Sequence, residues 1–532
     1  MIVNMAFSAV VRWIYTDKLC YLHKIDDICI VATVVVKLLS LLCNGEIKLF
    51  TPPLNTTKPM TNLFRKTISI AAAALLAVGA LTSCSEKNPV LTIEGGQVQG
   101  ILGENEGVYI YKGIPFAAAP VGELRWQAPQ PVTPWEGVKV ADSWGNAAVQ
   151  AAHREGDFYQ KEFFWEGDAP YSEDCLYLNV WTTKPGKTDA KLPVTLWIHG
   201  GGYTAGWGFE PEMDGEEWAK HGGVLVTFNY RLGIFGFFTH PLLSAESPNG
   251  VSGNYGMLDQ IAALKWVKEN IAQFGGDPDN VTIMGQSAGA MSVQSLVASP
   301  LSKNLIDKAI IQSGGGVSDN AVLRGGALAD GEAAGKKLMD WAGYDTLEKM
   351  RAASTEEIYT LSSRYMAETR EWLRVPSAPV LDGYAVTESF SEAVVNGTVS
   401  DVPYMIGGTL DDMGGLGAGP AVARFCTERE KVGGTTYAYQ FARKLPGDDA
   451  GAFHSSELWF MFKSLRLSWR PFTEGDYDLA ERMITAWTNF AATGDPNGKG
   501  AEGWTPFTEA NPEYMVFRLD ESGNEASSME KL

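Results

Sequence analysis

The chain has 532 residues, of which 45% are apolar, 20% are charged and 11% are aromatic. This balance excludes an intrinsically disordered chain and is sufficient for a large buried core. The formal net charge of −20 argues against nucleic acid or an anionic membrane surface as a partner, because both favour a basic face. Six cysteines in a chain of this length exclude a disulfide-rich scaffold.

The N-terminal region contains a second possible start at Met60. Two basic residues follow it, then an apolar stretch over 68–81, then small residues before Cys84. This order is typical of a secretory signal peptide, and the apolar stretch is too short and wrongly flanked for a transmembrane helix. The letters Leu-Thr-Ser-Cys at 81–84 resemble the bacterial lipobox. We therefore expect cleavage before Cys84 and acylation of its thiol.

Residues 1–59 precede this signal. We expect them to be an upstream extension of the reading frame that is not normally made, because a signal with its own Met would be pointless so far inside a chain. The alternative is an extra membrane anchor built on the apolar run at 28–36. On the favoured division, 60–83 is the signal peptide and 84–532 is one domain. That domain would be exported and held at a bacterial membrane by its lipid, on the periplasmic or cell-surface face.

Beyond Cys84, short β-rich runs alternate with helical stretches. The expected strands are Val194–His199, Val224–Tyr230, Val281–Met284, Lys308–Gln312 and Tyr404–Gly408, and the expected helices include Met257–Phe274 and Ala290–Ala298. Apolar strands between helices predict an α/β fold, with a mostly parallel sheet covered by helices on both faces. Residues 320–400 have an amphipathic helical pattern instead, which predicts a helical insertion over the site.

A candidate nucleophile lies in the sequence Gly-Gln-Ser-Ala-Gly at 285–289. An apolar strand precedes these residues and a helix follows them, which is the setting that a nucleophile elbow requires. The turn is so tight that only small residues fit beside the serine. We therefore predict that Ser287 is a nucleophile.

The partners of Ser287 are predicted from chain order, which in this type of site runs serine, acid, histidine. His454 is the only histidine after Ser287, so it is the candidate base. The acid should follow a strand between them, and Asp411 and Asp412 do so directly. Asp382 is a rival, but its Leu-Asp-Gly setting favours a turn aspartate that bonds its own backbone.

A second glycine-rich segment supplies candidate oxyanion donors. The expected strand at 194–199 ends in Gly200, Gly201 and Gly202, whose backbone N–H groups can approach a ligand because no Cβ intervenes. Together with the N–H of Ala288 they would face negative charge that develops on a substrate oxygen.

These motifs resemble those of the type-B carboxylesterases, the cholinesterase-like or para-nitrobenzyl esterase-like family of α/β-hydrolases. The resemblance covers about 90–517, and further motifs in the family's order carry it: Tyr-Lys-Gly-Ile-Pro-Phe-Ala at 111–117, Ser-Glu-Asp-Cys-Leu at 172–176, Asn-Tyr-Arg-Leu-Gly at 229–233 and Gly-Asp-Pro-Asn at 494–497. It implies one large catalytic domain with Ser287 as nucleophile, His454 as base, and Gly201, Gly202 and Ala288 as oxyanion donors.

Three positions depart from the family pattern. Met413 occupies the slot where the family places its acid, so Asp412, or alternatively Asp411, must take that role through a shift. Ala148 stands where the family has a cysteine, so Cys175 is expected to be a buried free thiol. Gln286 replaces a Glu found in eukaryotic relatives, which favours a neutral ester over a quaternary-ammonium substrate.

The sequence and the resemblance together predict a serine hydrolase that cleaves small carboxylic esters through an acyl-enzyme, with no metal and no organic cofactor. One alternative is an amide or carbamate hydrolase that uses the same triad. Another is a catalytically silent cholinesterase-like binding protein, but such proteins typically lose the nucleophile. The expected partners are a small-molecule ester and, through the lipid alone, a membrane. The oligomeric state is left open.

Overall fold

The computed structural model describes residues 88–532, apart from 166, 320–324, 414–416, 499 and 532. The chain divides into two units, Met1–Glu86 and Lys87–Leu532. The expected upstream extension, the signal peptide and Cys84 lie outside the described residues, and they stay predictions.

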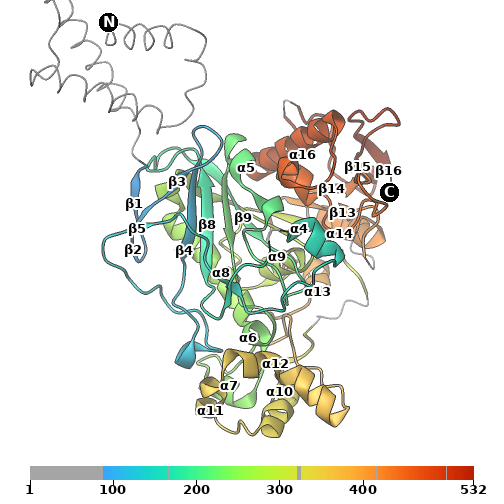
Figure 1. Cartoon of the computed structure of the whole chain (residues 1–532). Helices are drawn as coiled ribbons and strands as arrows, with labels where there is room; N and C mark the ends of the chain where they lie inside the picture. Colours follow the sequence, from blue (N-terminus) through green and yellow to red (C-terminus); the bar gives the residue numbers. More distant parts are fainter. Residues whose placement is uncertain (1–87, 166, 320–324, 414–416, 499, 532) are drawn as a thin grey trace, which may run out of the picture. The chain divides into compact units, whose positions relative to one another are not determined.

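An eleven-stranded sheet forms the centre of the described unit (Figure 1). Its spatial order is β16 (Ser528–Lys531), β15 (Glu513–Phe517), β14 (Thr436–Phe441), β13 (Tyr404–Thr409), β12 (Lys308–Gln312), β11 (Gly276–Gln286), β9 (Leu192–Ile198), β10 (Val224–Phe228), β8 (Tyr177–Thr182), β4 (Tyr109–Pro115) and β3 (Ile101–Leu102). Every neighbouring pair from β15 to β10 is parallel, and the pairs at both ends are antiparallel. The predicted mostly parallel sheet is confirmed.

Helices cover both faces of the sheet, as the sequence predicts. Ile283 and Met284 are successive residues of β11, so their side chains point to opposite faces, and they belong to two different hydrophobic clusters. Trp266 joins the first cluster and Trp487 joins the second. The helices of the first face include α8 (Tyr255–Asn270), α9 (Ala288–Ala298), α13 (Phe390–Val395) and α14 (Pro420–Lys431), and those of the second include α5 (Glu216–Lys220), α15 (Leu458–Met461) and α16 (Glu474–Thr493).

The helices predicted within 320–400 are also present, and their position over the site stays a prediction. Together with α6 (Gly233–Phe237) and α7 (Pro241–Glu246), the helices α10 (Leu328–Ala342), α11 (Leu347–Ala352) and α12 (Thr355–Thr369) gather at one end of this unit (Figure 1). They bury a third hydrophobic cluster of their own, which includes Leu338 and Leu361. This cluster allows the insertion to pack as a separate layer beside the sheet.

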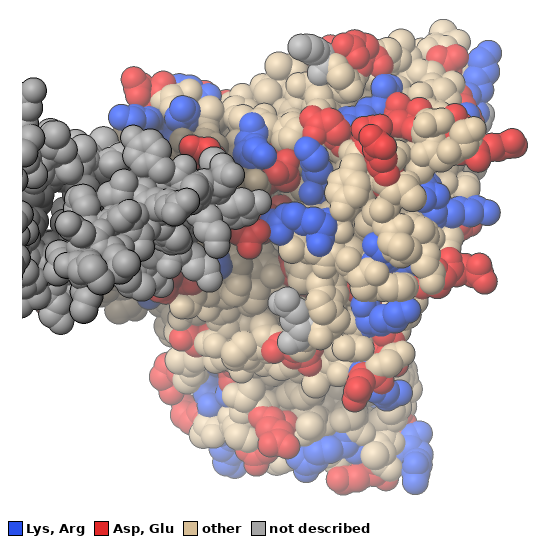
Figure 2. Space-filling view, turned by 45° about the horizontal axis from the view of Figure 1, so that its top comes forward, with Lys and Arg blue, Asp and Glu red and all other residues tan. Residues whose placement is uncertain are grey.

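Smaller elements complete the described part of the chain. The strands β1 (Val90–Ile93), β2 (Gly96–Gln99) and β5 (Val138–Val140) form one small sheet, and β6 (Ala147–Ala148) pairs with β7 (Tyr171–Ser172) to close the segment that carries α4 (Phe158–Phe163). Lys and Arg are interspersed with Asp and Glu on the face shown in Figure 2. Within the described residues, none of the helices has the length and apolar character needed to span a membrane.

Candidate active site

Ser287 lies at the sharp turn between β11 and α9. Its backbone adopts φ 58° and ψ −122°, a conformation that costs about 1–3 kcal/mol in a residue with a side chain. The turn holds its shape because the Ser287 N–H donates to the carbonyl of Gln312, at 2.9 Å. A Cβ on Gly289 would lie 2.0 Å from the carbonyl oxygen of Ile198, so helix and strand approach closely only with glycine there. These features are those of the predicted nucleophile elbow.

His454 and Asp412 form a buried pair. The Nδ1–H of His454 donates to Oδ1 of Asp412 at 2.6 Å, and both side chains are about 5% exposed or less. Burial alone would raise the pKa of Asp412. The hydrogen bond and charge of His454 oppose it, together with hydrogen bonds from Ser313 and the Met413 N–H, and the net effect lowers the pKa. The carboxylate is thus held ionised against the imidazole ring.

Asp411 lies next in the chain but makes different contacts. Its Oδ2 accepts the backbone N–H of Ala452 at 2.8 Å, and its own N–H donates to the carbonyl of Ala452. Asp411 also forms an isolated parallel bridge with Phe453. It therefore ties the end of β13 to the loop that precedes His454, whereas Asp412 contacts the imidazole itself.

The second ring nitrogen of His454 faces the elbow. Because Nδ1 carries the proton donated to Asp412, Nε2 is the acceptor, and the amide of Gln286 donates to it at 3.2 Å. Gln286 directly precedes Ser287. Among the described residues, this amide is the hydrogen-bond partner of Nε2. Catalytic hydrogen bonds often form only in the complex with substrate.

The glycine segment after β9 lies beside the elbow. A Cβ built on Gly200 would stand 3.2 Å from Cβ of Ser287. Gly201 has φ +89°, and its carbonyl accepts the N–H groups of Thr204 and Ala205, both at 3.0 Å. The N–H groups of Gly201, Gly202 and Ala288 donate to no other group among the described residues. They are therefore available to a substrate oxygen.

Two polar residues that the sequence did not single out lie behind Asp412. Ser313 has φ 51°, and its Oγ lies 3.5 Å from Oε1 of Glu457. Glu457 is fully buried. Burial, followed by the nearby charge of Asp412, raises the pKa of Glu457 to about 8. Glu457 is the N-cap residue of α15, and no sequence pattern pointed to it.

The segment that carries α4 packs directly on the His454 loop. The hydroxyl of Tyr159 donates to the backbone carbonyl of His454 at 3.1 Å. Glu162 is buried against Arg470, whose guanidinium also donates to Asp448 in the loop before His454. The indole N–H of Trp459 also donates to the carboxylate of Glu162, at 2.9 Å. This set of contacts joins α4 to the chain around the imidazole.

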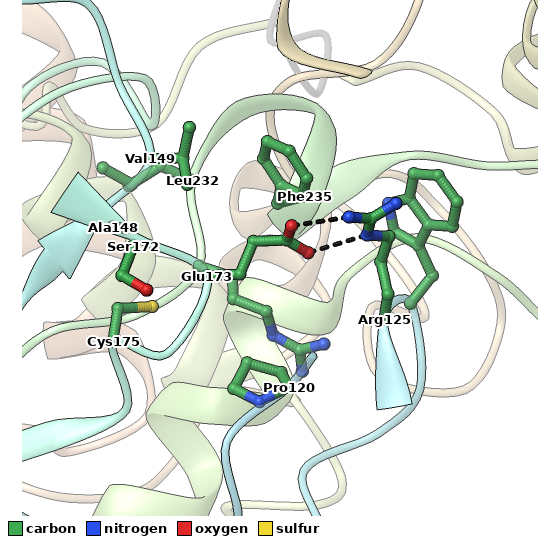
Figure 3. Close-up of a pocket in the computed structure, with 11 residues that line it drawn as sticks. Pro120, Arg125, Ala148, Val149, Ser172, Glu173, Cys175, Leu232 and Phe235 are labelled. Carbon is green, nitrogen blue, oxygen red and sulfur yellow. Dashed lines mark hydrogen bonds and ion pairs between the residues drawn. The ribbon is translucent and has the colours of Figure 1, made fainter. Parts of the chain in front are cut away.

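A small cavity near β6 is lined by none of Ser287, His454, Asp412 and the glycine segment (Figure 3). Its volume is about 10 Å³, enough for roughly one water molecule. The buried ion pair of Arg125 and Glu173 forms part of its lining, with the shortest N–O distance at 2.6 Å (Figure 3). The cavity is too small for an ester. No group of three His, Cys, Asp or Glu side chains in the described ranges is placed to hold a metal ion.

Two other predictions can be checked here. Cys175 lines this cavity as a buried free thiol, with Ala148 also on the wall, so the expectation of an unpaired cysteine is confirmed. Oδ1 of Asp382 accepts the backbone N–H groups of Tyr384, Ala385 and Val386, each at 2.9 Å. Asp382 is the turn residue that its sequence indicated.

Comparison with known proteins identifies the family. The model of the family described as "Carboxylesterase family" matches residues 87–419 and 418–531. The para-nitrobenzyl esterase of Bacillus subtilis strain 168 is 32% identical over 501 residues, which cover 83% of this chain and 98% of that protein. The fumonisin B1 esterase of Sphingopyxis macrogoltabida is 38% identical over 369 residues, or 66% of this chain. The match spans 63% of that relative, less than two thirds of its length.

Solved structures agree with these sequence matches. A PNB esterase superposes with a TM-score of 0.69 at 29% identity, covering 83% of this chain and 97% of that one. A structure titled thermophilic PNB esterase gives a TM-score of 0.70 at 29% identity, with 83% and 98% covered. The predicted α/β-hydrolase fold is thereby confirmed. The chain belongs to the carboxylesterase family and is a serine hydrolase of carboxylic esters.

Proposed function

We propose that Ser287, His454 and Asp412 form the catalytic triad of this esterase. The observation that carries the proposal is the 2.6 Å hydrogen bond from Nδ1 of His454 to Asp412, with Nε2 turned toward the residue that precedes Ser287. Asp412 fixes the tautomer, so the free lone pair of Nε2 is directed at the elbow.

The reaction follows from this arrangement. Ser287 Oγ attacks the ester carbonyl carbon while its proton passes to Nε2 of His454. The N–H groups of Gly201, Gly202 and Ala288 stabilise the negative oxygen of the tetrahedral intermediate, and each such donor typically contributes about 2.7–4 kcal/mol. The proton on Nε2 then leaves with the alcohol. Water hydrolyses the acyl-serine by the same steps in reverse.

Replacing each aspartate separately tests the assignment of the acid. Asp412→Asn should lower kcat for a p-nitrophenyl ester by about 10⁴-fold, because it removes the charge and the tautomer control at His454. Asp411→Asn is the matched control one residue away, and it should retain most of the turnover while lowering thermal stability. Equal activity of the two variants would overturn the assignment.

For the substrate class we propose neutral esters. Gln286 places an uncharged amide directly before Ser287, where a carboxylate would attract a cation. Butyrylthiocholine and its uncharged carbon isostere, 3,3-dimethylbutyl thiobutyrate, differ only in charge. We expect the isostere to have the higher kcat/KM. In Gln286→Glu, the ratio of kcat/KM for the isostere to kcat/KM for the choline ester should be smaller. A preference for the choline ester in the unmodified enzyme would contradict this proposal.

We also propose that the protein is exported as a lipoprotein acylated at Cys84. The support is the order of basic residues, apolar stretch and lipobox-like residues from Met60 to Cys84. In cells that express the chain from Met60, a radiolabelled fatty acid should appear on the protein and its activity should sediment with membranes. Cys84→Ser should lose both. Label retained in that variant would contradict the proposal.

A further inference from the structure

His199 stands at the end of β9, directly before the glycine segment, and its ring is fully buried. The ring stacks on Tyr230 at a centroid distance of 4.4 Å. On another side, a Cβ at Gly206 would come within 2.7 Å of Nδ1. The backbone carbonyl of His199 accepts the Tyr230 hydroxyl at 3.1 Å. The orientation of the imidazole is thus fixed by packing.

The protons of this ring can be assigned from its contacts. Nδ1 lies 3.0 Å from the carbonyl oxygen of Gly200, so it carries the proton and donates. Nε2 is buried and has no hydrogen-bond partner among the described residues, which fits an unprotonated nitrogen. Burial lowers the pKa of His199 to about 4, against the opposing effect of the Gly200 bond, so the ring is neutral at pH 7.

The carbonyl that His199 holds belongs to the same peptide plane as the N–H of Gly201. Because the peptide unit is planar and trans, a bond that fixes the Gly200 C=O also fixes the direction of the Gly201 N–H, which points the opposite way. The next peptide is held differently. The carbonyl of Gly201, which shares a plane with the N–H of Gly202, accepts two backbone N–H groups from Thr204 and Ala205.

We infer that His199 is a positioning residue that orients the Gly201 N–H toward the oxyanion, by donating from Nδ1 to the Gly200 carbonyl. This inference rests on the proposed role of Gly201. The two donors therefore have different supports: a backbone turn holds the Gly202 N–H, and a single buried side chain holds the Gly201 N–H. Without that side chain, the glycine-rich peptide is free to rotate away from the substrate.

A pair of amide replacements tests the inference. In His199→Asn the Nδ2 amide takes nearly the place of Nδ1 and can donate to the Gly200 carbonyl. In His199→Gln the amide lies one bond further out, near the position of Nε2. We expect His199→Asn to keep kcat within about threefold. His199→Gln should lower kcat by roughly 10- to 100-fold with little change in KM, since part of one oxyanion donor is lost.

A second measurement separates positioning from general damage. A trifluoromethyl ketone becomes a tetrahedral oxyanion on Ser287, so its Ki should rise in each variant by the factor by which kcat/KM falls. A structural defect alone would not produce this proportionality. Equal kcat values in His199→Asn and His199→Gln, or a Ki that does not follow kcat/KM, would overturn the role of His199. Failure of the unmodified protein to hydrolyse esters or to react at Ser287 would instead overturn the proposed function.

Discussion

At the scale of single residues, the described site combines one carboxyl that is held ionised with another that is held neutral. Burial would raise the pKa of Asp412, but His454, Ser313 and the Met413 N–H together lower it, whereas the pKa of Glu457 is raised to about 8 by burial and by Asp412. The hydroxyl of Ser313 lies between the two carboxyls. A neutral Glu457 avoids a second negative charge next to Asp412.

The raised pKa of Glu457 predicts that the effect of Glu457→Gln on the free energy of unfolding depends on pH. The folded-state pKa of Glu457 is above its ordinary value of 4.5, so its contribution to the free energy of unfolding is fully present below pH 4.5. That contribution is lost as the pH rises toward about 8. Glu457→Gln does not titrate, so we expect it to gain stability relative to the unmodified protein between pH 5 and pH 8. Urea denaturation of both proteins across this range measures the difference, and a constant difference would contradict the prediction.

The sequence was informative for some of these residues and not for others. Ser287 and His454 could be predicted because the elbow has a characteristic pattern and one histidine follows it. Asp411 and Asp412 could not be separated, because the pairing of the loop with Ala452 decides which side chain turns toward the imidazole. The role inferred for His199 depends on a bond to its own neighbour, which no spacing reveals.

At the scale of secondary structure, strands buried on both faces were the easiest elements to predict. The run Lys308–Gln312 is β12 in the structure with the same bounds, and all five of its residues are buried around the apolar centre Ala-Ile-Ile. In contrast, β11 begins at Gly276, five residues before the expected start at Val281. Gly276 pairs with Leu192 across an irregularity in register, so tertiary pairing rather than apolar pattern extends this strand.

The α4 segment gives a prediction at the same scale. Glu162 and Arg470 are at most 1% exposed, so Glu162→Gln leaves a buried guanidinium with only part of its partners. We expect a loss of about 3–5 kcal/mol in the free energy of unfolding, and a smaller additional loss when Arg470→Met is combined with it. Asp340→Asn, which removes a partner from the exposed pair with Lys336, is the control and should change stability by less than about 1 kcal/mol. Denaturant curves give the free energy of unfolding of each variant. If the losses in Glu162→Gln and Arg470→Met simply add in the double variant, the two residues are not coupled and the prediction is contradicted.

At the scale of the whole molecule, one sheet supplies every group in the proposed reaction. The carboxyl ends of β9, β11 and β13 lead into the glycine segment, Ser287 and Asp412, and the chain after β14 supplies His454. Parallel strands bring such ends to one edge, which is where ligands bind in open α/β sheets. The large core on both faces holds this edge rigid.

In the proposed mechanism the nucleophile, the base and the oxyanion donors are all groups of the protein, so we expect the activity to be independent of added or removed metal. Dialysis against EDTA should leave the hydrolysis of p-nitrophenyl butyrate within experimental error of the untreated enzyme. A fluorophosphonate should abolish it by reaction at Ser287. Loss of activity on chelation, with recovery on adding a divalent cation, would contradict this prediction.

The central claim is that hydrolysis passes through an acyl group on Ser287. A rapid-mixing experiment with p-nitrophenyl butyrate, stopped with acid and followed by peptide mass spectrometry, tests it most directly. We predict a burst of p-nitrophenol that approaches one equivalent per enzyme, with butyryl on the Ser287 peptide, provided that deacylation is the slower step. Ser287→Ala should show neither. Undiminished turnover in Ser287→Ala, or an acyl group on another residue, would contradict the claim.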